Sequence, residues 1–141
     1  MTLPFEILLV EDNEGDVEMV RRALREVIPA CNLSLASDGA EALDYLFKRG
    51  EFLQAARPNL LFLDLNMPGM DGKEALKLIK SDERVKTIPI AIFTSSDATS
   101  DIQESYANHA NCYVVKPFDT KEYKSAIKGT VNFWRNLAVL P

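Results

Sequence analysis

Short apolar segments alternate with segments of helical periodicity along the whole 141-residue chain, and this alternation restricts the possible folds more than any other feature. The helical segments carry apolar residues three or four positions apart. Continuous apolar strands that alternate with helices are typical of a parallel sheet covered by helices on both faces. The predicted strands are 5–10, 33–36, 59–64, 88–94 and 112–115, and the predicted helices are 16–28, 38–50, 72–80, 98–108 and 120 onward.

This pattern predicts a doubly wound α/β fold, a flavodoxin-like (βα)5 arrangement with strand order 2-1-3-4-5. We expect one domain over residues 1–141, with an extended C-terminal helix and tail from about 130–141. The net charge of −5 argues against a nucleic-acid partner. No apolar run approaches the roughly 20 residues needed to cross a membrane, and the N-terminus lacks a basic leader. Two cysteines without metal-like spacing favour reduced thiols, so we expect a cytoplasmic protein.

The sharpest functional signal is Asp64, which follows the apolar run Leu60–Leu63. Burying a lone carboxylate is costly unless its surroundings compensate. The first predicted strand likewise ends in Glu11-Asp12, the fourth in Thr94, and the fifth runs into Lys116. In a parallel sheet the carboxyl ends of the strands share one edge, so these side chains are expected to converge there.

Three neighbouring carboxylates need more positive charge than Lys116 alone supplies, which indicates a cation. Carboxylate ligands without histidine or cysteine suit Mg²⁺. In such a site Asp64 can act as a nucleophile toward a phosphoryl group, while Lys116 and Thr94 neutralise its oxygens. Any one of these residues, taken alone, is explained better by a helix cap or a surface charge; their arrival at one sheet edge favours a shared site.

Four motifs on four strand ends, "LLVEDN", "FLDLNMPGMDG", "IFTSSD" and "YVVKPF", resemble those of the receiver domain of two-component response regulators. The resemblance implies that Asp64 is the phosphoacceptor. It implies that Mg²⁺ is held by Glu11, Asp12, Asp64 and the backbone carbonyl of Asn66. Glu11 stands where many members of the family have aspartate.

The same resemblance implies roles for residues around the acceptor. Lys116 would pair with the phosphoryl group, with a cis peptide bond between Lys116 and Pro117. Thr94 and Tyr113 match the switch pair of the family, in which the aromatic ring follows the hydroxyl toward the phosphoryl group. Asn66 and Ser96 would tune the lifetime of the phosphoryl group.

The stretch from Gly39 to Asp64 and the ending "GTVNFWRNLAVLP" are similar to those of the receiver-only partners of cyanobacterial phytochromes. The expected function is that of a stand-alone response regulator phosphorylated by a histidine kinase, here a light-sensing, phytochrome-type kinase. Such a protein is not a turnover enzyme, although it would catalyse its own phosphorylation and slow hydrolysis. Without an output domain, its signal would pass through a protein contact, a further phosphotransfer or dimer exchange.

Other functions fit the sequence less well. A degenerate receiver used only for protein interaction is disfavoured because every acceptor-site residue is present. A phosphatase with an Asp-x-Asp nucleophile pair would need an acid where Asn66 stands. A flavin carrier of the same fold would need a phosphate-binding loop after the first strand, and "EDNEGD" would repel an anion.

On the last helix an apolar stripe of Tyr123, Ile127, Val131 and Trp134 faces the core. A second apolar stripe, offset from it, is formed by Phe133, Leu137 and Leu140. An uncovered apolar stripe needs a partner surface. Two interpretations remain open: the stripe pairs with its counterpart in a C2 homodimer, or the tail bends at Ala138 and folds back on its own domain.

Overall fold

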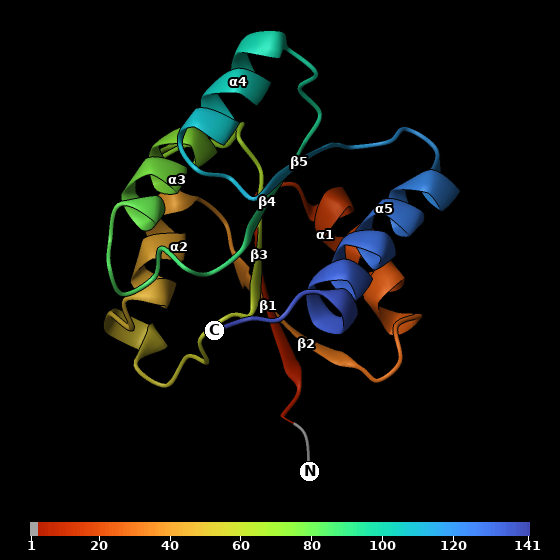
Figure 1. The fold of residues 1–141 in the computed structure, drawn as a ribbon, viewed down its shortest axis with the longest axis horizontal. Coiled ribbons are helices and arrows are strands. Elements are labelled where there is room, and N and C mark those ends of the chain that lie inside the picture. Colours follow the sequence, from red (N-terminus) through yellow and green to blue (C-terminus); the bar gives the residue numbers. More distant parts are fainter. Residues whose placement is uncertain (1–2) are drawn as a thin grey trace.

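The computed structural model describes residues 3–141 and shows five parallel strands in a single sheet of order β2-β1-β3-β4-β5 (Figure 1). The predicted fold class and strand order are therefore confirmed. The strands are β1 (Phe5–Val10), β2 (Cys31–Ala36), β3 (Leu60–Leu63), β4 (Ile90–Thr94) and β5 (Cys112–Val115).

Helices cover both faces of the sheet. Figure 1 shows α1 and α5 on one side and α2, α3 and α4 on the other. A 3-10 turn (Gly50–Phe52) follows α2, and a π-helical turn, η2 (Phe133–Leu137), extends α5. The helices are α1 (Glu14–Arg25), α2 (Gly39–Leu46), α3 (Gly72–Lys80), α4 (Thr99–Ala107) and α5 (Thr120–Asn132).

The central strands are apolar along their whole length because alternate residues enter two different cores. Leu61 and Leu63 of β3 pack in the core beneath α2 and α3. Leu60 and Phe62 of the same strand pack in the core beneath α1 and α5. Because both faces of the sheet are covered by apolar packing, polar functional side chains can be placed only at the ends of the strands.

The helix and strand boundaries differ from prediction at several points. Helix α1 starts at Glu14 because the side chain of Asn13 caps it, accepting a hydrogen bond from the Asp16 N–H at 2.9 Å. It ends at Arg25, three residues before the apolar spacing would end it. Strand β2 begins earlier than predicted and β4 begins later. Within residues 3–141 the cis peptide bond is Ile28–Pro29, so the prediction of a cis Lys116–Pro117 bond is wrong.

The core-facing stripe lies on α5 and η2, whereas the second stripe is divided, with Phe133 and Leu137 on η2 and Leu140 beyond it. Tyr123, Ile127 and Val131 are buried against the sheet, whereas Phe133 and Leu137 are exposed. The helical segment ends at Leu137 and Ala138 adopts an extended conformation, which is the bend that the fold-back interpretation requires. Within the described residues, no helix combines the length and the apolar character that a membrane crossing requires.

Candidate functional site

The polar residues predicted at the strand ends are placed rigidly by the sheet itself. The backbone N–H of Glu11 donates to β2 at 2.9 Å, that of Asp64 to β1 at 3.1 Å, and that of Lys116 to β4 at 2.7 Å. Each residue therefore extends the hydrogen bonding of the sheet by one position beyond its own strand. The side chains leave the sheet at one edge, as predicted.

Glu11, Asp12 and Asp64 form a compact acidic cluster. Each offers a carboxylate oxygen, and these oxygens lie within 4.8 Å of one another. Glu11 and Asp64 are buried, whereas Asp12 is exposed to solvent. Three carboxylate oxygens with one open side are a donor set suited to a hard divalent cation such as Mg²⁺, which keeps several of its waters.

Lys116 lies between the carboxylates, and its side chain is almost wholly buried. Its Nζ donates to Glu11 Oε1 at 2.6 Å and to Asp64 Oδ2 at 3.1 Å. A third contact, to Asp16 Oδ2 at 3.1 Å, was not predicted. The ammonium thus compensates the buried carboxylates, which is why Asp64 can occupy the end of so apolar a strand.

Burial and charge set the protonation of this group of residues. Burial raises the pKa of Glu11 to about 7; the hydrogen bond from Lys116 opposes this shift, and the Asp64 charge adds to it. Burial alone would lower the pKa of Lys116, but the hydrogen bond with Glu11 and the charge of Asp64 outweigh it and raise that pKa. The ammonium therefore stays charged, and near neutral pH a proton competes with a metal ion for Glu11.

The predicted switch residues meet at the loop that follows β4. Thr94 is fully buried at the end of the strand, and its Oγ1 accepts a long hydrogen bond from the Ser96 N–H at 3.5 Å. The hydroxyl of Tyr113 donates to the Ser96 carbonyl at 2.9 Å. The Ser96 side chain in turn donates to Asp101 of α4. Thr94 and Tyr113 are thus connected through one loop residue that also contacts α4.

The acceptor loop is closed by a very near approach of α3 to the end of β3. The N–H of Gly72 donates to the Leu65 carbonyl at 3.1 Å. A Cβ atom at position 72 would lie 2.0 Å from the backbone oxygen of Asp64, so only glycine fits there. Asn66 is exposed in this loop, and its N–H lies 3.3 Å from Asp64 Oδ1.

Two site residues were missed by the sequence analysis. Tyr123 of α5 donates its hydroxyl proton to Asp16 Oδ1 at 2.6 Å, and Asp16 in turn contacts Lys116. Burial and the Asp16 carboxylate raise the pKa of Tyr123, so its hydroxyl remains protonated. The available signal was a tyrosine in a core-facing stripe, because a buried tyrosine hydroxyl usually needs a partner.

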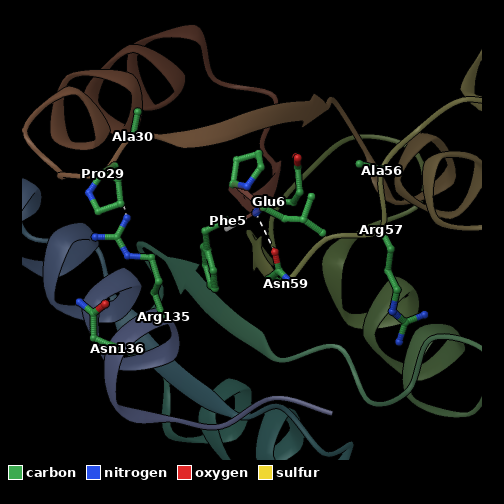
Figure 2. A pocket seen from close by; sticks show the side chains of 11 residues that line it. Phe5, Glu6, Pro29, Ala30, Ala56, Arg57, Asn59, Arg135 and Asn136 are labelled. Atoms are coloured by element: carbon green, nitrogen blue, oxygen red, sulfur yellow. Dashed lines mark hydrogen bonds between the residues drawn. The ribbon is translucent and has the colours of Figure 1, made fainter. Parts of the chain in front are cut away.

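A larger hollow of about 830 Å³ lies at the opposite, amino-terminal edge of the sheet (Figure 2). Figure 2 shows the guanidinium of Arg135 beside Pro29, to whose carbonyl it donates at 2.6 Å. The Arg57 guanidinium is bound to the Arg84 carbonyl at 2.7 Å. The lining includes Phe5, Ala30 and Ala56 but no cluster of reactive side chains among the described residues. The chemistry of the fold therefore lies at the edge that carries Asp64.

Comparison with known proteins identifies the class of protein that this fold and site define. Residues 7–128 match the family model of the response regulator receiver domain. The chain therefore belongs to the response regulator receiver family. Receiver domains accept phosphoryl groups from histidine kinases and generally bind Mg²⁺, so the protein is a signalling protein of two-component systems.

The chain is similar to individual receivers over nearly its full length. It is 37% identical to "Response regulator Rcp1" of Synechocystis, covering 98% of this chain and 94% of that protein. It is 35% identical to the "Probable methanogenesis regulatory protein FilR2" of Methanothrix harundinacea, covering 93% and 84%. The structure of the phosphorylated cyanobacterial phytochrome response regulator RcpA superposes with a TM-score of 0.95 at 39% identity, covering 99% of both chains. The predicted resemblance to phytochrome response regulators is confirmed.

Proposed function

We propose that this protein accepts a phosphoryl group from the histidine of a kinase onto Asp64, with Mg²⁺ held by Glu11, Asp12, Asp64 and the backbone carbonyl of Asn66. The observation that carries the proposal is the position of the Lys116 ammonium, 3.1 Å from the Asp64 carboxylate within the acidic cluster. A cation bound by the cluster would neutralise charge on the phosphoryl oxygens.

The residues of the chain supply positioning and charge for the transfer. A carboxylate oxygen of Asp64 attacks phosphorus in line with the leaving imidazole; the new O–P bond forms as the P–N bond of the phosphohistidine breaks. Lys116 exchanges its contact with Asp64 for one with a phosphoryl oxygen. The Thr94 hydroxyl, buried beside the site, donates to another phosphoryl oxygen.

In the proposed cycle the protein catalyses its own phosphorylation and slow hydrolysis and is otherwise not an enzyme. Asn66 and Ser96 flank the approach of water to the acyl phosphate and tune its lifetime. The two positions are accessible to different degrees, since Asn66 is exposed and Ser96 is half-buried.

The conformational output is proposed to start at Thr94. Movement of its hydroxyl toward the phosphoryl group breaks the weak contact with the Ser96 N–H. Because Tyr113 is bonded to the carbonyl of the same residue, its ring follows the loop. The surface formed by α4, β5 and α5 then changes shape, which is how the signal reaches another protein.

The proposed partner is a phytochrome-type histidine kinase that acts in the cytoplasm, where ATP supplies the phosphoryl group. Support comes from the similarity to RcpA, which is described as a cyanobacterial phytochrome response regulator. We further propose that residues 1–141 act as one receiver domain. No DNA or membrane contact is needed for this function.

Incubation with acetyl phosphate tests the proposed reaction. The intact mass should increase by one phosphoryl group with Mg²⁺ and remain unchanged after chelation. Asp64→Asn should abolish labelling, whereas Asp44→Asn, which removes an exposed carboxylate on α2 paired with Arg49, should leave it intact. Equal labelling of Asp64→Asn and the wild-type protein would refute the assignment of the acceptor.

A homodimer through the second C-terminal stripe is also proposed. Phe133 is 48% exposed and Leu137 is 76% exposed, while Leu140 is half-buried. Light scattering coupled to size-exclusion chromatography should show a dimer that Leu137→Glu converts to a monomer. Leu53→Glu alters a similarly exposed leucine elsewhere and should leave the dimer intact. A wild-type monomer at micromolar concentration would exclude this pairing.

A further inference from the structure

The Lys116 ammonium has no free donor. A lysine ammonium carries three N–H groups, and the three carboxylates of Glu11, Asp16 and Asp64 lie at 2.6, 3.1 and 3.1 Å. Glu11 and Asp64 also belong to the acidic cluster suited to a cation, whereas Asp16 does not. Asp16 is therefore the one carboxylate partner of Lys116 that has no second role in the site.

The position of the Asp16 carboxylate is fixed by two hydrogen bonds, one at the backbone of Asp16 and one at its side chain. Its own N–H is bound by the cap residue Asn13 at 2.9 Å, which fixes the first turn of α1. Its Oδ1 accepts the Tyr123 hydroxyl at 2.6 Å, which leaves Oδ2 directed at Lys116. Each oxygen of the carboxylate thus has its own partner, one from α5 and one from the residue that follows β5.

The Tyr123 ring is held as firmly as its hydroxyl. The residue is 6% exposed, and its ring packs edge-on against Phe93 of β4 at 5.0 Å between centroids. The Lys116 Nζ lies 5.9 Å from the centroid of the same Phe93 ring. Packing therefore restricts the hydroxyl of Tyr123 to the position that meets Asp16.

We propose that Asp16, oriented by the Tyr123 hydroxyl, is a positioning residue that keeps the Lys116 ammonium beside Asp64 during phosphoryl transfer. This inference rests on the proposed function, because it concerns the residue that would contact the phosphoryl group. When Glu11 and Asp64 take up a cation and a phosphoryl group, Lys116 loses part of its interaction with each. Asp16 then supplies the contact that does not change.

The role predicts different kinetic effects for two substitutions. Tyr123→Phe removes only the hydroxyl that orients Asp16, so the maximal rate of phosphorylation by acetyl phosphate should fall about tenfold, as expected for losing one charge-assisted hydrogen bond. Asp16→Asn should lower the maximal rate similarly. It also removes a negative charge near an anion-binding site, so its KM for acetyl phosphate should fall as well.

Three controls separate positioning from structure. Tyr45→Phe removes a buried hydroxyl bonded to Ser34 and Ala56 on the other face and should leave the rate unchanged. Tyr123→Phe should keep its Mg²⁺ affinity, measured without phosphodonor, because no cluster carboxylate is altered. The double variant of Asp16 and Tyr123 should be no slower than Asp16→Asn alone, because the two residues act in series.

A measurement on the metal-free protein tests the geometry without any phosphodonor. In NMR, the ¹⁵Nζ of Lys116 should show a through-hydrogen-bond coupling to the carboxyl carbon of Asp16, and Tyr123→Phe should weaken it. Absence of that coupling, or a wild-type rate in Tyr123→Phe, overturns the positioning role. If the wild-type protein is not phosphorylated on Asp64 at all, the proposed function fails instead.

Discussion

Replacement of Gly72 by alanine tests how Asp64 is held in place. The added Cβ would lie 2.0 Å from the Asp64 carbonyl oxygen and 2.8 Å from Leu65 Cα. Ordinary contact at that oxygen needs more than one additional ångström, and both neighbouring atoms are backbone atoms that no rotamer change can move. Overpacking of this kind costs about 1–3 kcal/mol. Because the atoms that the Cβ would overlap belong to the backbone, we expect the upper end of this range, about 3 kcal/mol. Alanine returns up to about 1 kcal/mol through helix propensity, so the expected net destabilisation is about 2 kcal/mol.

Gly129→Ala is the matched control. Gly129 lies inside α5, and a Cβ there would meet no atom within 4 Å. This variant should gain about 0.5–1 kcal/mol of stability. Urea denaturation should therefore shift the midpoint in opposite directions for the two variants at an unchanged m-value. Displacement of Asp64 should also slow phosphorylation of Gly72→Ala, but not of Gly129→Ala.

A Gly72→Ala protein as stable as Gly129→Ala would refute the reasoning, because the end of β3 could then move away from α3 at no cost. Normal phosphorylation in a clearly destabilised Gly72→Ala protein would also contradict it. In that case the acceptor would tolerate displacement of its backbone.

Lys116→Met removes the cation from between buried carboxylates. The free energy of unfolding of the metal-free protein, measured by urea denaturation at pH 8, should therefore fall by about 3–5 kcal/mol. An unchanged free energy of unfolding would contradict the buried ion pairing. The pKa of Glu11 is about 7 in the folded state against its ordinary value of 4.5, so the folded protein holds this proton more tightly than the unfolded chain does. The contribution of the proton to folding stability is therefore complete below pH 4.5 and is lost as the pH rises through 7. Mg²⁺ affinity measured by calorimetry should accordingly increase from pH 6 to 8, and this dependence should flatten in Glu11→Gln. On the surface, hydrogen bonds from Lys124 and Lys128 of α5 lower the pKa of Glu26, at the end of α1, to about 2. The stabilisation from these two contacts is therefore present above pH 4.5 and is lost as the pH falls toward 2. Glu26→Gln should lower the melting temperature slightly at low ionic strength and not at high salt; an equal decrease in both would argue against an electrostatic cause.

The topology could be predicted from the sequence because burial on both faces forces each strand of this sheet to be continuously apolar. Once the order of strands is known, the positions of Glu11, Asp64 and Lys116 follow, since each comes directly after a strand. Their convergence needed no knowledge of side-chain conformation. The same reasoning could not give distances, or show which carboxylates contact Lys116.

Asp16 and Tyr123 illustrate what the pattern could not provide. An acidic residue in the first turn of a helix is explained by the helix dipole, so Asp16 carried no distinct signal. Tyr123 shares helical spacing with Ile127 and Val131. This periodicity predicts that the ring is buried, but it does not show which residue the hydroxyl contacts. Their contact joins residues separated by more than one hundred positions, and only the packing of α1 against α5 creates it.

The close approach at Gly72 was also beyond prediction. In the sequence, a glycine at the start of a helical segment indicates a turn or a helix start. The structure adds a second reason, because Gly72 is the first residue of α3 and its missing side chain makes room for the backbone of Asp64. That requirement depends on the distance between two elements, which local propensity does not encode.

Chemical trapping of the acyl phosphate tests the central claim most directly. Protein incubated with acetyl phosphate and Mg²⁺ is reduced with borohydride, which converts a phosphorylated aspartate to homoserine, and its peptides are sequenced by mass spectrometry. Homoserine should appear at position 64 alone, and only when Mg²⁺ was present. Homoserine at another position, or at position 64 without any divalent cation, would contradict a magnesium-dependent acceptor at the end of β3.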